Sequence, residues 1–189
     1  MPNSGSVYAR TYLKRLQAIL DNMDLDSVGT VIDEFAKARD RRSTIFFMGN
    51  GGSAATANHF ANDLGVCASP QGKIPFRSIS LASNVAYLTC IGNDFGYENI
   101  FVRQLQNIMS PNDLVVGISA SGNSPNVVNA LKYARENAGI PVAIVGFDGG
   151  EMKKIASHVI HVKSEKGEYG PVEDVHMVLD HLISTYLAH

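Results

Sequence analysis

Two short polar turns carry the residues whose types and spacing point to ligand binding. The first is Gly49–Ser53, where an apolar run ends in GNGGS before an Ala-rich segment with helical spacing. The second is Ser119–Ser124, SASGNS, which follows the apolar run 114–118 and precedes Pro125. Hydroxyl groups, glycine backbone and the free N–H groups at a helix start together suit one terminal phosphate group. Neither turn has a nucleotide-binding glycine pattern, so we expect no nucleotide cofactor.

Either turn taken alone is also explained as an ordinary strand–helix connection, with Ser53 or Ser124 as a helix cap. The elements around the turns decide between these interpretations. The predicted strands are 44–48, 76–81, 114–118, 141–147 and 159–162. Continuous apolar strands that alternate with helices are typical of a parallel sheet covered on both faces. We predict an α/β three-layer sandwich with a five-stranded flavodoxin-like sheet, whose ligands bind beyond the carboxyl ends of the strands. Both turns then open on one edge, which favours a phosphorylated small molecule.

The helical patterns surround these strands and also precede them. The predicted helices are 7–23, one capped by Asp26 or Ser27, 53–64, 85–90, 97–109, 124–137, 152–155 and 172–187, with turns or loops at 70–72 and 93–96. Two amphipathic helices before the first strand are more than one α/β layer needs, so we expect them to cover a neighbouring subunit. The prediction is one domain over residues 1–189, with a helical extension at 1–41 and an α/β core with a C-terminal helix at 42–189.

Composition restricts the classes of function. The 189 residues are 45% hydrophobic, and the net charge of −2 comes without a long basic run, so we expect no direct binding of nucleic acid. No apolar stretch has membrane-spanning length, and the first residues lack a secretory signal pattern. Cys67 and Cys90 lack metal-site or C-x-x-C spacing and are expected to be free thiols. A cytoplasmic protein with no membrane association is the expectation.

Five segments carry a resemblance to a known family. They are GNGGSAATANHFANDL, IGNDFGYENIF, ISASGNSPNV, GFDGGEMKKIA and VEDVHMVLDH. Together they resemble the sugar isomerase (SIS) domain, and more closely its phosphoheptose isomerase branch, which includes sedoheptulose 7-phosphate isomerase and a DnaA-binding initiator-associating protein. The resemblance covers nearly the whole chain, including the two leading helices.

The resemblance implies a site that binds a sugar phosphate and a zinc ion. The residues that it assigns to the substrate are Asn50, Gly51, Gly52, Ser53, Asn93, Asp94, Ser119, Ala120, Ser121, Ser124 and Glu173. The metal ligands that it implies are His59, Asp63, Glu173 and His181. It also implies a homotetramer whose active sites lie at subunit interfaces, with a contribution from the last helix.

Three positions depart from the family pattern. The acidic residue after the histidine is usually Glu and is here the shorter Asp63, while the position usually held by Gln is Glu173. The Arg that usually follows four residues after the acidic position is replaced by Cys67. A carboxylate has therefore moved from one wall of the site to the other, which leaves open whether Asp63 or Glu173 is the base.

The spacing of the proposed ligands gives an independent reason to consider a metal. His59 and Asp63 are four residues apart on one helix face, so both can reach one ion, although such a pair is more often a solvated surface pair. Glu173 and His181 are about 12 Å apart along a helix axis at about 1.5 Å per residue. Glu173 would therefore have to reach the ion from the first turn or the preceding loop.

The other histidines have structural interpretations. His176 and Asp180 form a second pair with a spacing of four residues on a different helix face, which we interpret as structural or interfacial. His158, His161 and His189 fall in a predicted strand, at its end and at the C-terminus.

The predicted function is a ketose–aldose isomerase acting on sedoheptulose 7-phosphate, for synthesis of nucleotide-heptose or surface-polysaccharide precursors. Moving a proton between C1 and C2 needs a base, stabilisation of the enediolate oxygen and an acid. Asp63 or Glu173 is the base in this hypothesis, His181 is the acid, and zinc polarises the carbonyl. The alternative is a non-catalytic sugar-phosphate-binding regulator or a DnaA-binding protein, which the substituted positions favour.

Overall fold

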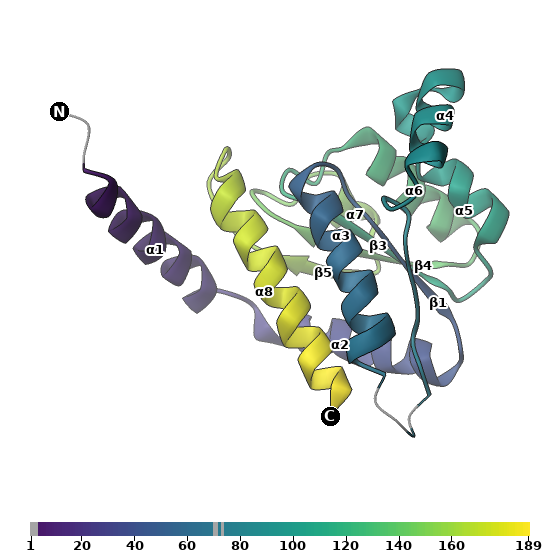
Figure 1. Ribbon diagram of the computed structural model, residues 1–189, viewed down its shortest axis with the longest axis horizontal. Coiled ribbons are helices and arrows are strands. Elements are labelled where there is room, and N and C mark those ends of the chain that lie inside the picture. The colour runs from purple at the N-terminus through teal and green to yellow at the C-terminus, as the bar shows by residue number, and fades with distance from the viewer. Residues whose placement is uncertain (1–3, 70–71, 73) are drawn as a thin grey trace.

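A five-stranded parallel sheet forms the centre of the computed structural model, which describes residues 4–69, 72 and 74–189 (Figure 1). The strands are β1 Thr44–Met48, β2 Arg77–Ser80, β3 Leu114–Ser119, β4 Ile140–Val145 and β5 His158–His161. Their order is β2-β1-β3-β4-β5, and every neighbouring pair is parallel. This is the flavodoxin-like order, so the predicted fold is confirmed. Each predicted strand is also confirmed, to within two residues at its ends.

Helices cover both faces of the sheet and create two hydrophobic cores. One face carries α2 Leu25–Asp40, α3 Gly52–Asn62 and α8 Tyr169–Ala188, and the other carries α4 Val85–Phe95, α5 Val102–Ile108, α6 Pro125–Glu136 and α7 Met152–Ile155. Successive β1 side chains point to opposite faces. Phe47 therefore stacks on Phe60 of α3 with ring centroids 5.0 Å apart, while Phe46 joins the core beneath α5 and α6.

The two polar turns lie at the position where the direction of the chain connections reverses. From β1 the chain passes through α3 to β2 on one side, whereas from β3 it passes through α6 to β4 on the other. In open parallel sheets this reversal leaves a crevice beyond the carboxyl ends of the strands. The turns after β1 and β3 therefore share one edge of the sheet, as predicted.

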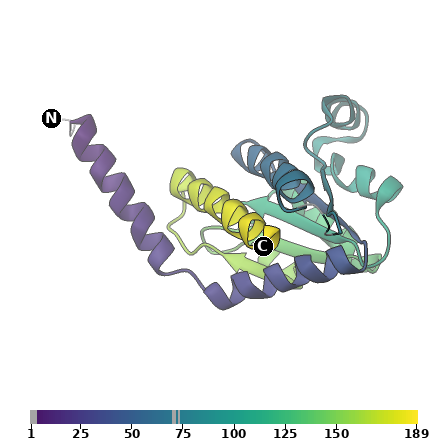
Figure 2. The same cartoon turned by 60° about the horizontal axis from the view of Figure 1, so that its bottom comes forward.

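Helix α1, Gly5–Asp21, projects from the body of the molecule (Figures 1 and 2). Ile19 is its only fully buried residue. Near its middle, the Tyr12 hydroxyl donates to an Asp174 carboxylate oxygen of α8 at 2.6 Å, and Arg15 pairs with Glu168 at 2.6 Å. Leu16, Ile19 and Leu20 in its C-terminal half pack against the hydrophobic core, whereas Val7, Tyr8 and Leu13 are exposed.

Three helix ends differ from the predictions. Ser53 does not cap α3, because the carbonyl oxygens of Asn50 and Gly51 already accept helical hydrogen bonds from Ala54 and Gly51 takes the capping position with φ +53°. Helix α2 is capped by Asp24, whose carboxylate accepts from the Ser27 backbone, rather than by Asp26 or Ser27. The helix start predicted at Ser124 and Pro125 is confirmed, although the Ser124 hydroxyl makes no capping hydrogen bond.

The region after β2 also differs. The turn predicted at 93–96 is wrong, because α4 continues to Phe95 and ends at Gly96, whose φ of +89° breaks the helix. The single helix predicted over 97–109 is a 3-10 turn, Tyr97–Asn99, followed by the shorter α5. The loop predicted at 70–72 lies mostly outside the described residues. In the part of the chain that is described, no helix is long and apolar enough to cross a membrane.

Candidate functional site

The serine turn after β3 brings three hydroxyl groups together at the N-terminus of α6. Ser119 Oγ lies 3.3 Å from Ser124 Oγ and 3.5 Å from Ser121 Oγ, and it accepts a hydrogen bond from the Gly122 amide at 3.2 Å. Gly122 has φ +64°, and a side chain there would run into the Gly149 carbonyl. The turn therefore depends on glycine to pack closely, and it offers hydroxyl and amide donors to an anion.

A cavity of about 200 Å³ lies between the serine turn, the glycine turn and the start of α8. Its lining residues are Asn50, Ser53, Ile118, Ser119, Ala120, Ser121, Ser124, Tyr169 and Glu173. Seven of the residues predicted to bind substrate thus share one cavity, and Glu173 is the only carboxylate in that lining. A site with hydroxyl donors at one end and a carboxylate can bind a small phosphorylated molecule and exchange a proton with it.

Within the glycine turn, Asn50 and Ser53 line the cavity, whereas Gly52 allows the approach of Glu173. A Cβ atom at Gly52 would overlap the Glu173 carboxylate, so only glycine lets α8 place this group against the first turn of α3. The positive end of the α3 dipole stabilises a carboxylate there. Gly51, at φ +53°, makes the backbone reversal that starts the helix.

Asn50 is held in place by two residues of the quoted segments to which the sequence patterns assigned no role. The Asn50 and Asn126 side-chain amides exchange two hydrogen bonds of 2.9 Å, and the Tyr97 hydroxyl donates to Asn50 Oδ1 at 2.9 Å. Asn126 is buried in the first turn of α6. These contacts orient the Asn50 amide at the cavity wall.

Four predicted substrate residues do not line the cavity of this chain: Gly51 and Gly52 in the glycine turn, and Asn93 and Asp94. Asn93 and Asp94 lie exposed in the last turn of α4, where the Asn93 amide donates to an Asp94 carboxylate oxygen at 2.6 Å. A second cavity, of about 250 Å³, shares Ser121 and Tyr169 with the first, and Lys166 is among its lining residues. Nothing in the spacing of this loop had indicated Tyr169 or Lys166.

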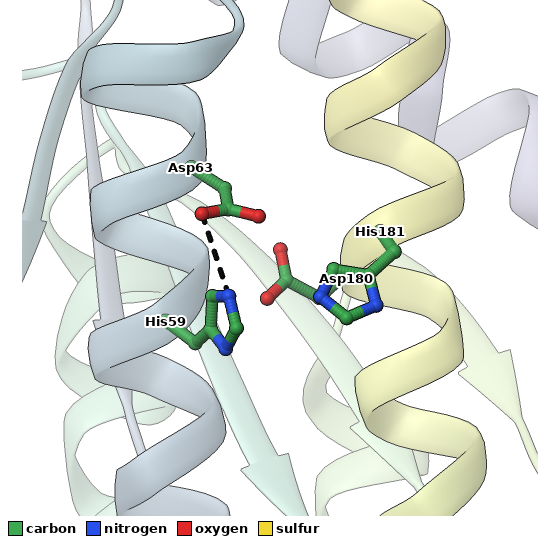
Figure 3. Close-up of side chains that lie close together, drawn as sticks. All are labelled: His59, Asp63, Asp180 and His181. Carbon is green, nitrogen blue, oxygen red and sulfur yellow. Dashed lines mark ion pairs between the residues drawn. The ribbon is translucent and has the colours of Figure 1, made fainter.

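A second cluster of chemical groups lies further along the seam between α3 and α8. Potential ligand atoms of His59, Asp63, Asp180 and His181 all lie within 4.8 Å of one another (Figure 3). His59 Nε2 is 3.4 Å from Asp63 Oδ1, and the His59 and His181 rings are 5.1 Å apart between centroids. Asp63 begins a π-helical turn that follows α3. We call these four residues the His–Asp cluster.

The structure corrects the interpretation of Asp180. Its side chain does not lie on a separate face from the predicted ligands, but points from α8 toward Asp63 (Figure 3). Asp180 is fully buried, and neither carboxylate oxygen has a hydrogen-bond partner in the described part of the chain. Burial, and secondarily the charge of Asp63, raises the pKa of Asp180 to about 7. His176 is also fully buried, and burial lowers its pKa to about 4.

The donor set of the His–Asp cluster fits a divalent metal ion. Two imidazoles and two carboxylates are ligands that Zn²⁺ accepts in four-coordinate sites. The unpaired, buried oxygens of Asp180 need a positive charge nearby, which a metal ion supplies. Three of the four predicted ligands, His59, Asp63 and His181, belong to the cluster, whereas Glu173 is not a member.

Comparisons with known proteins identify the family. The SIS domain model matches residues 8–146. A phosphoheptose isomerase of Maridesulfovibrio salexigens is 40% identical over 147 residues, which are 78% of this chain and 70% of that protein. Another, of Mycobacterium bovis, is 32% identical over 188 residues, covering 97% and 92%. The chain belongs to the SIS domain family. The resemblance expected from the five segments is confirmed, within the phosphoheptose isomerase branch.

Solved structures agree with this membership. The phosphoheptose isomerase GmhA from Neisseria gonorrhoeae matches with a TM-score of 0.85 and 25% identity, covering 96% of this chain and 95% of the other. In this SIS domain, α3 and α8 lie side by side and run in the same direction (Figure 1). The contacts agree with this arrangement: Gly52 near the start of α3 faces Glu173, and His59 further along faces His181. The cavity and the His–Asp cluster therefore occupy successive levels of one seam.

Proposed function

We propose that this SIS domain is a ketose–aldose isomerase that converts sedoheptulose 7-phosphate to a heptose 7-phosphate. The observation that carries the proposal is the shared cavity, in which Glu173 and the serine turn line the same space. Relatives up to 40% identical that are named phosphoheptose isomerase support the choice of substrate. The serine turn binds the phosphate through its hydroxyl groups and the N-terminus of α6.

Glu173 is the proposed base. It is the carboxylate of the cavity lining, whereas Asp63 is paired with His59 and belongs to the His–Asp cluster. Isomerisation removes a proton from C1 and returns one to C2, while a hydroxyl proton passes from O1 to O2. A single carboxylate can carry the carbon-bound proton in both halves of this reaction. His181 is the proposed acid for the oxygens, because an imidazole exchanges protons readily near neutral pH.

His59, Asp63 and His181 are the proposed ligands of a zinc ion. When bound, such an ion polarises the substrate carbonyl and stabilises negative charge on oxygen. A ligand imidazole binds metal through one ring nitrogen, so His181 retains a second nitrogen for proton exchange. The fit of the donor set supports this part of the proposal.

The proposed assembly is a homotetramer in the cytoplasm that supplies heptose precursors for lipopolysaccharide or capsule synthesis. Large apolar side chains are exposed on α1, α4 and α8, including Leu13, Val85 and Tyr186. Asn93 and Asp94 are exposed on α4 and do not reach the cavity of their own chain. We propose that they face the sugar in a neighbouring subunit.

The test is an isomerase assay over ketose phosphates of five to seven carbons, with zinc content measured on the same protein. The proposal predicts turnover of sedoheptulose 7-phosphate above that of shorter ketoses. Tight binding of sugar phosphates without turnover of any of them would favour a regulatory binding protein instead.

A further inference from the structure

Asp180 is in an environment that is costly for an unpaired carboxylate. It is fully buried, neither oxygen has a hydrogen-bond partner among the described residues, and Asp63 lies beside it in the His–Asp cluster. Removing a carboxylate from water without a partner costs several kcal/mol, and a second carboxylate nearby adds repulsion. Either a proton on Asp180 or a positive charge between Asp63 and Asp180 relieves this cost, and the positive charge is required when both carboxylates are ionised.

The described cations do not meet this need. The ion pairs that the structure contains do not include Asp180, and the groups nearest to it are the imidazoles of His59 and His181. One protonated imidazole would balance only one of the two carboxylates. A divalent cation balances both and uses the two neutral imidazoles as further ligands, which gives a site without net charge.

Glu173, by contrast, does not belong to the cluster. It precedes His181 by eight residues of a continuous helix, which is about 12 Å along the axis. Helix α8 starts at Tyr169, so Glu173 lies in a regular turn and not in a loop that could bend toward the ion. Its carboxylate instead packs against Gly52 at the wall of the cavity.

We infer that Asp180 is a metal ligand of this chain and completes a site of two histidines and two aspartates, in the place that the family resemblance assigns to Glu173. Asp180 compensates for the short side chain of Asp63, and Glu173 stays free to face the sugar. The inference deepens the proposed function and rests on it only in assuming that a divalent cation is bound.

The experiment is a titration of the chelator-treated full chain with Zn²⁺ alone, in competition with a chromophoric chelator. The proteins are the wild type, Asp180→Asn, Glu173→Gln and Asp174→Asn, each of which exchanges a carboxylate for an amide on α8. Asp174 is exposed and serves as the matched control. We expect Asp180→Asn to weaken zinc binding by more than about 100-fold, because loss of a direct ligand exceeds the loss of an outer partner. Glu173→Gln and Asp174→Asn should bind zinc as the wild type does.

Two further measurements separate ligation from a purely structural role. Metal-free Asp180→Asn should melt no lower than the metal-free wild type, because it removes an unpaired buried carboxylate, while its zinc-induced rise in Tm shrinks. Asp180→Cys with Co²⁺ should show a thiolate-to-metal charge-transfer band, because a cysteine at a ligand position binds metal as the thiolate. This band reports ligation directly, without a comparison of protein stabilities. It therefore still tests the inference if Asp180→Asn folds poorly.

Wild-type zinc affinity in Asp180→Asn, zinc loss in Glu173→Gln, or a wild type that binds no zinc would each overturn the inference. A wild type that isomerises sugar phosphates while Asp180→Asn keeps its zinc overturns the inference and leaves the proposed function intact. Zinc loss in Asp180→Asn, together with a wild type that isomerises no ketose phosphate, refutes the proposed function and leaves Asp180 as a ligand.

Discussion

Glu173 and Asp63 divide between them tasks that depend on different surroundings. Glu173 lines a cavity beside hydroxyl donors and the N-terminus of α3, whereas Asp63 lies against His59 and a second carboxylate. A base needs access to the substrate carbon, and a ligand needs access to the ion. A side chain shortened by one C–C bond, about 1.5 Å, is poorly placed for proton transfer but can still bind a metal.

This division predicts different defects in three variants. Glu173→Gln should lower kcat by about 10²-fold or more while zinc content stays normal, because the proton carrier is lost. Asp63→Asn and His59→Ala should mainly lower zinc content, and added zinc should recover part of their turnover. The measurement is kcat against zinc content for all three proteins. Full turnover in Glu173→Gln with collapse in zinc-loaded Asp63→Asn would return the role of base to Asp63.

His176 predicts a pH dependence of stability. Burial holds its pKa at about 4, against 6.5 for an ordinary histidine, so between these values the unfolded chain binds a proton that the folded chain does not. The contribution of His176 to the free energy of unfolding is therefore fully present above pH 6.5. It is lost as the pH drops toward 4, by up to about 3 kcal/mol. His176→Leu should remove this contribution and lose less stability than the wild type between pH 7 and 4.5.

Urea unfolding of metal-free wild type and His176→Leu at several pH values checks this expectation. The raised pKa of Asp180 acts in the opposite direction, since it favours the folded state at low pH, but it is present in both proteins. The difference between the two curves thus reports on His176. Parallel curves would show that His176 does not titrate with the expected shift.

At the scale of elements, the serine turn joins β3 to α6 and supplies the anion-binding groups. Ser121 lies where the two adjoining cavities meet, and its hydroxyl also accepts from the Asn123 amide at 3.2 Å. Ser121→Ala should weaken the binding of a sugar phosphate by about 1.5–3 kcal/mol, the value of one hydrogen bond to a charged group. Titration calorimetry measures the loss, with Ser83→Ala, an exposed serine outside both cavities, as the control. Equal affinities for the two variants would exclude Ser121 from the phosphate site.

The sequence predicted the strands well because each is a short apolar run between strong turn signals. Strand β1 matches its prediction at both ends, since the polar residues Arg42 and Ser43 precede it and Gly49 follows it. Helix ends were harder to predict, because competing caps stand close together: Asp24, Asp26 and Ser27 are all suitable by type, and only the backbone geometry selects Asp24. Asn93 and Asp94 look like the start of a turn but lie inside a helix that ends only at Gly96.

Site residues were likewise predicted where the local sequence identified them and missed where the packing of two elements decides. Motif residues of the two turns were found because their types are unusual in a strand–helix connection, and the fold brings them to one cavity. Asp180 was not found, because it follows a spacing of four from His176 that suggests a different face from that of His181. Its role depends on how α8 packs against α3, and the spacing of residues on a single helix does not show that packing. The same limit applies to Asn126 and Tyr97, which hold Asn50 from two other elements.

At the scale of the whole molecule, the isolated chain leaves apolar side chains of one helix, α1, exposed. Helix α1 extends from the body (Figure 2). It exposes Val7, Tyr8 and Leu13, which are 46%, 66% and 63% accessible. Apolar side chains clustered on one arm are typical of a surface that another protein chain covers. Together with Asn93 and Asp94, which do not reach their own cavity, this arm supports an assembly in which subunits complete one another.

The last prediction tests that assembly through α1. Leu13→Glu places a charge where a neighbouring subunit should pack, and it removes no buried contact within the chain, because Leu13 is exposed. We expect the wild type to sediment as a tetramer and Leu13→Glu to sediment as a smaller species with an unchanged circular dichroism spectrum. Lys14→Gln, at the next and also exposed position, should remain tetrameric.

Because Asn93 and Asp94 are proposed to act in a neighbouring site, isomerase activity should fall in step with dissociation. A wild type that sediments as a monomer at micromolar concentration would contradict the assembly, and a fully active monomer of Leu13→Glu would show that each site is complete within one chain.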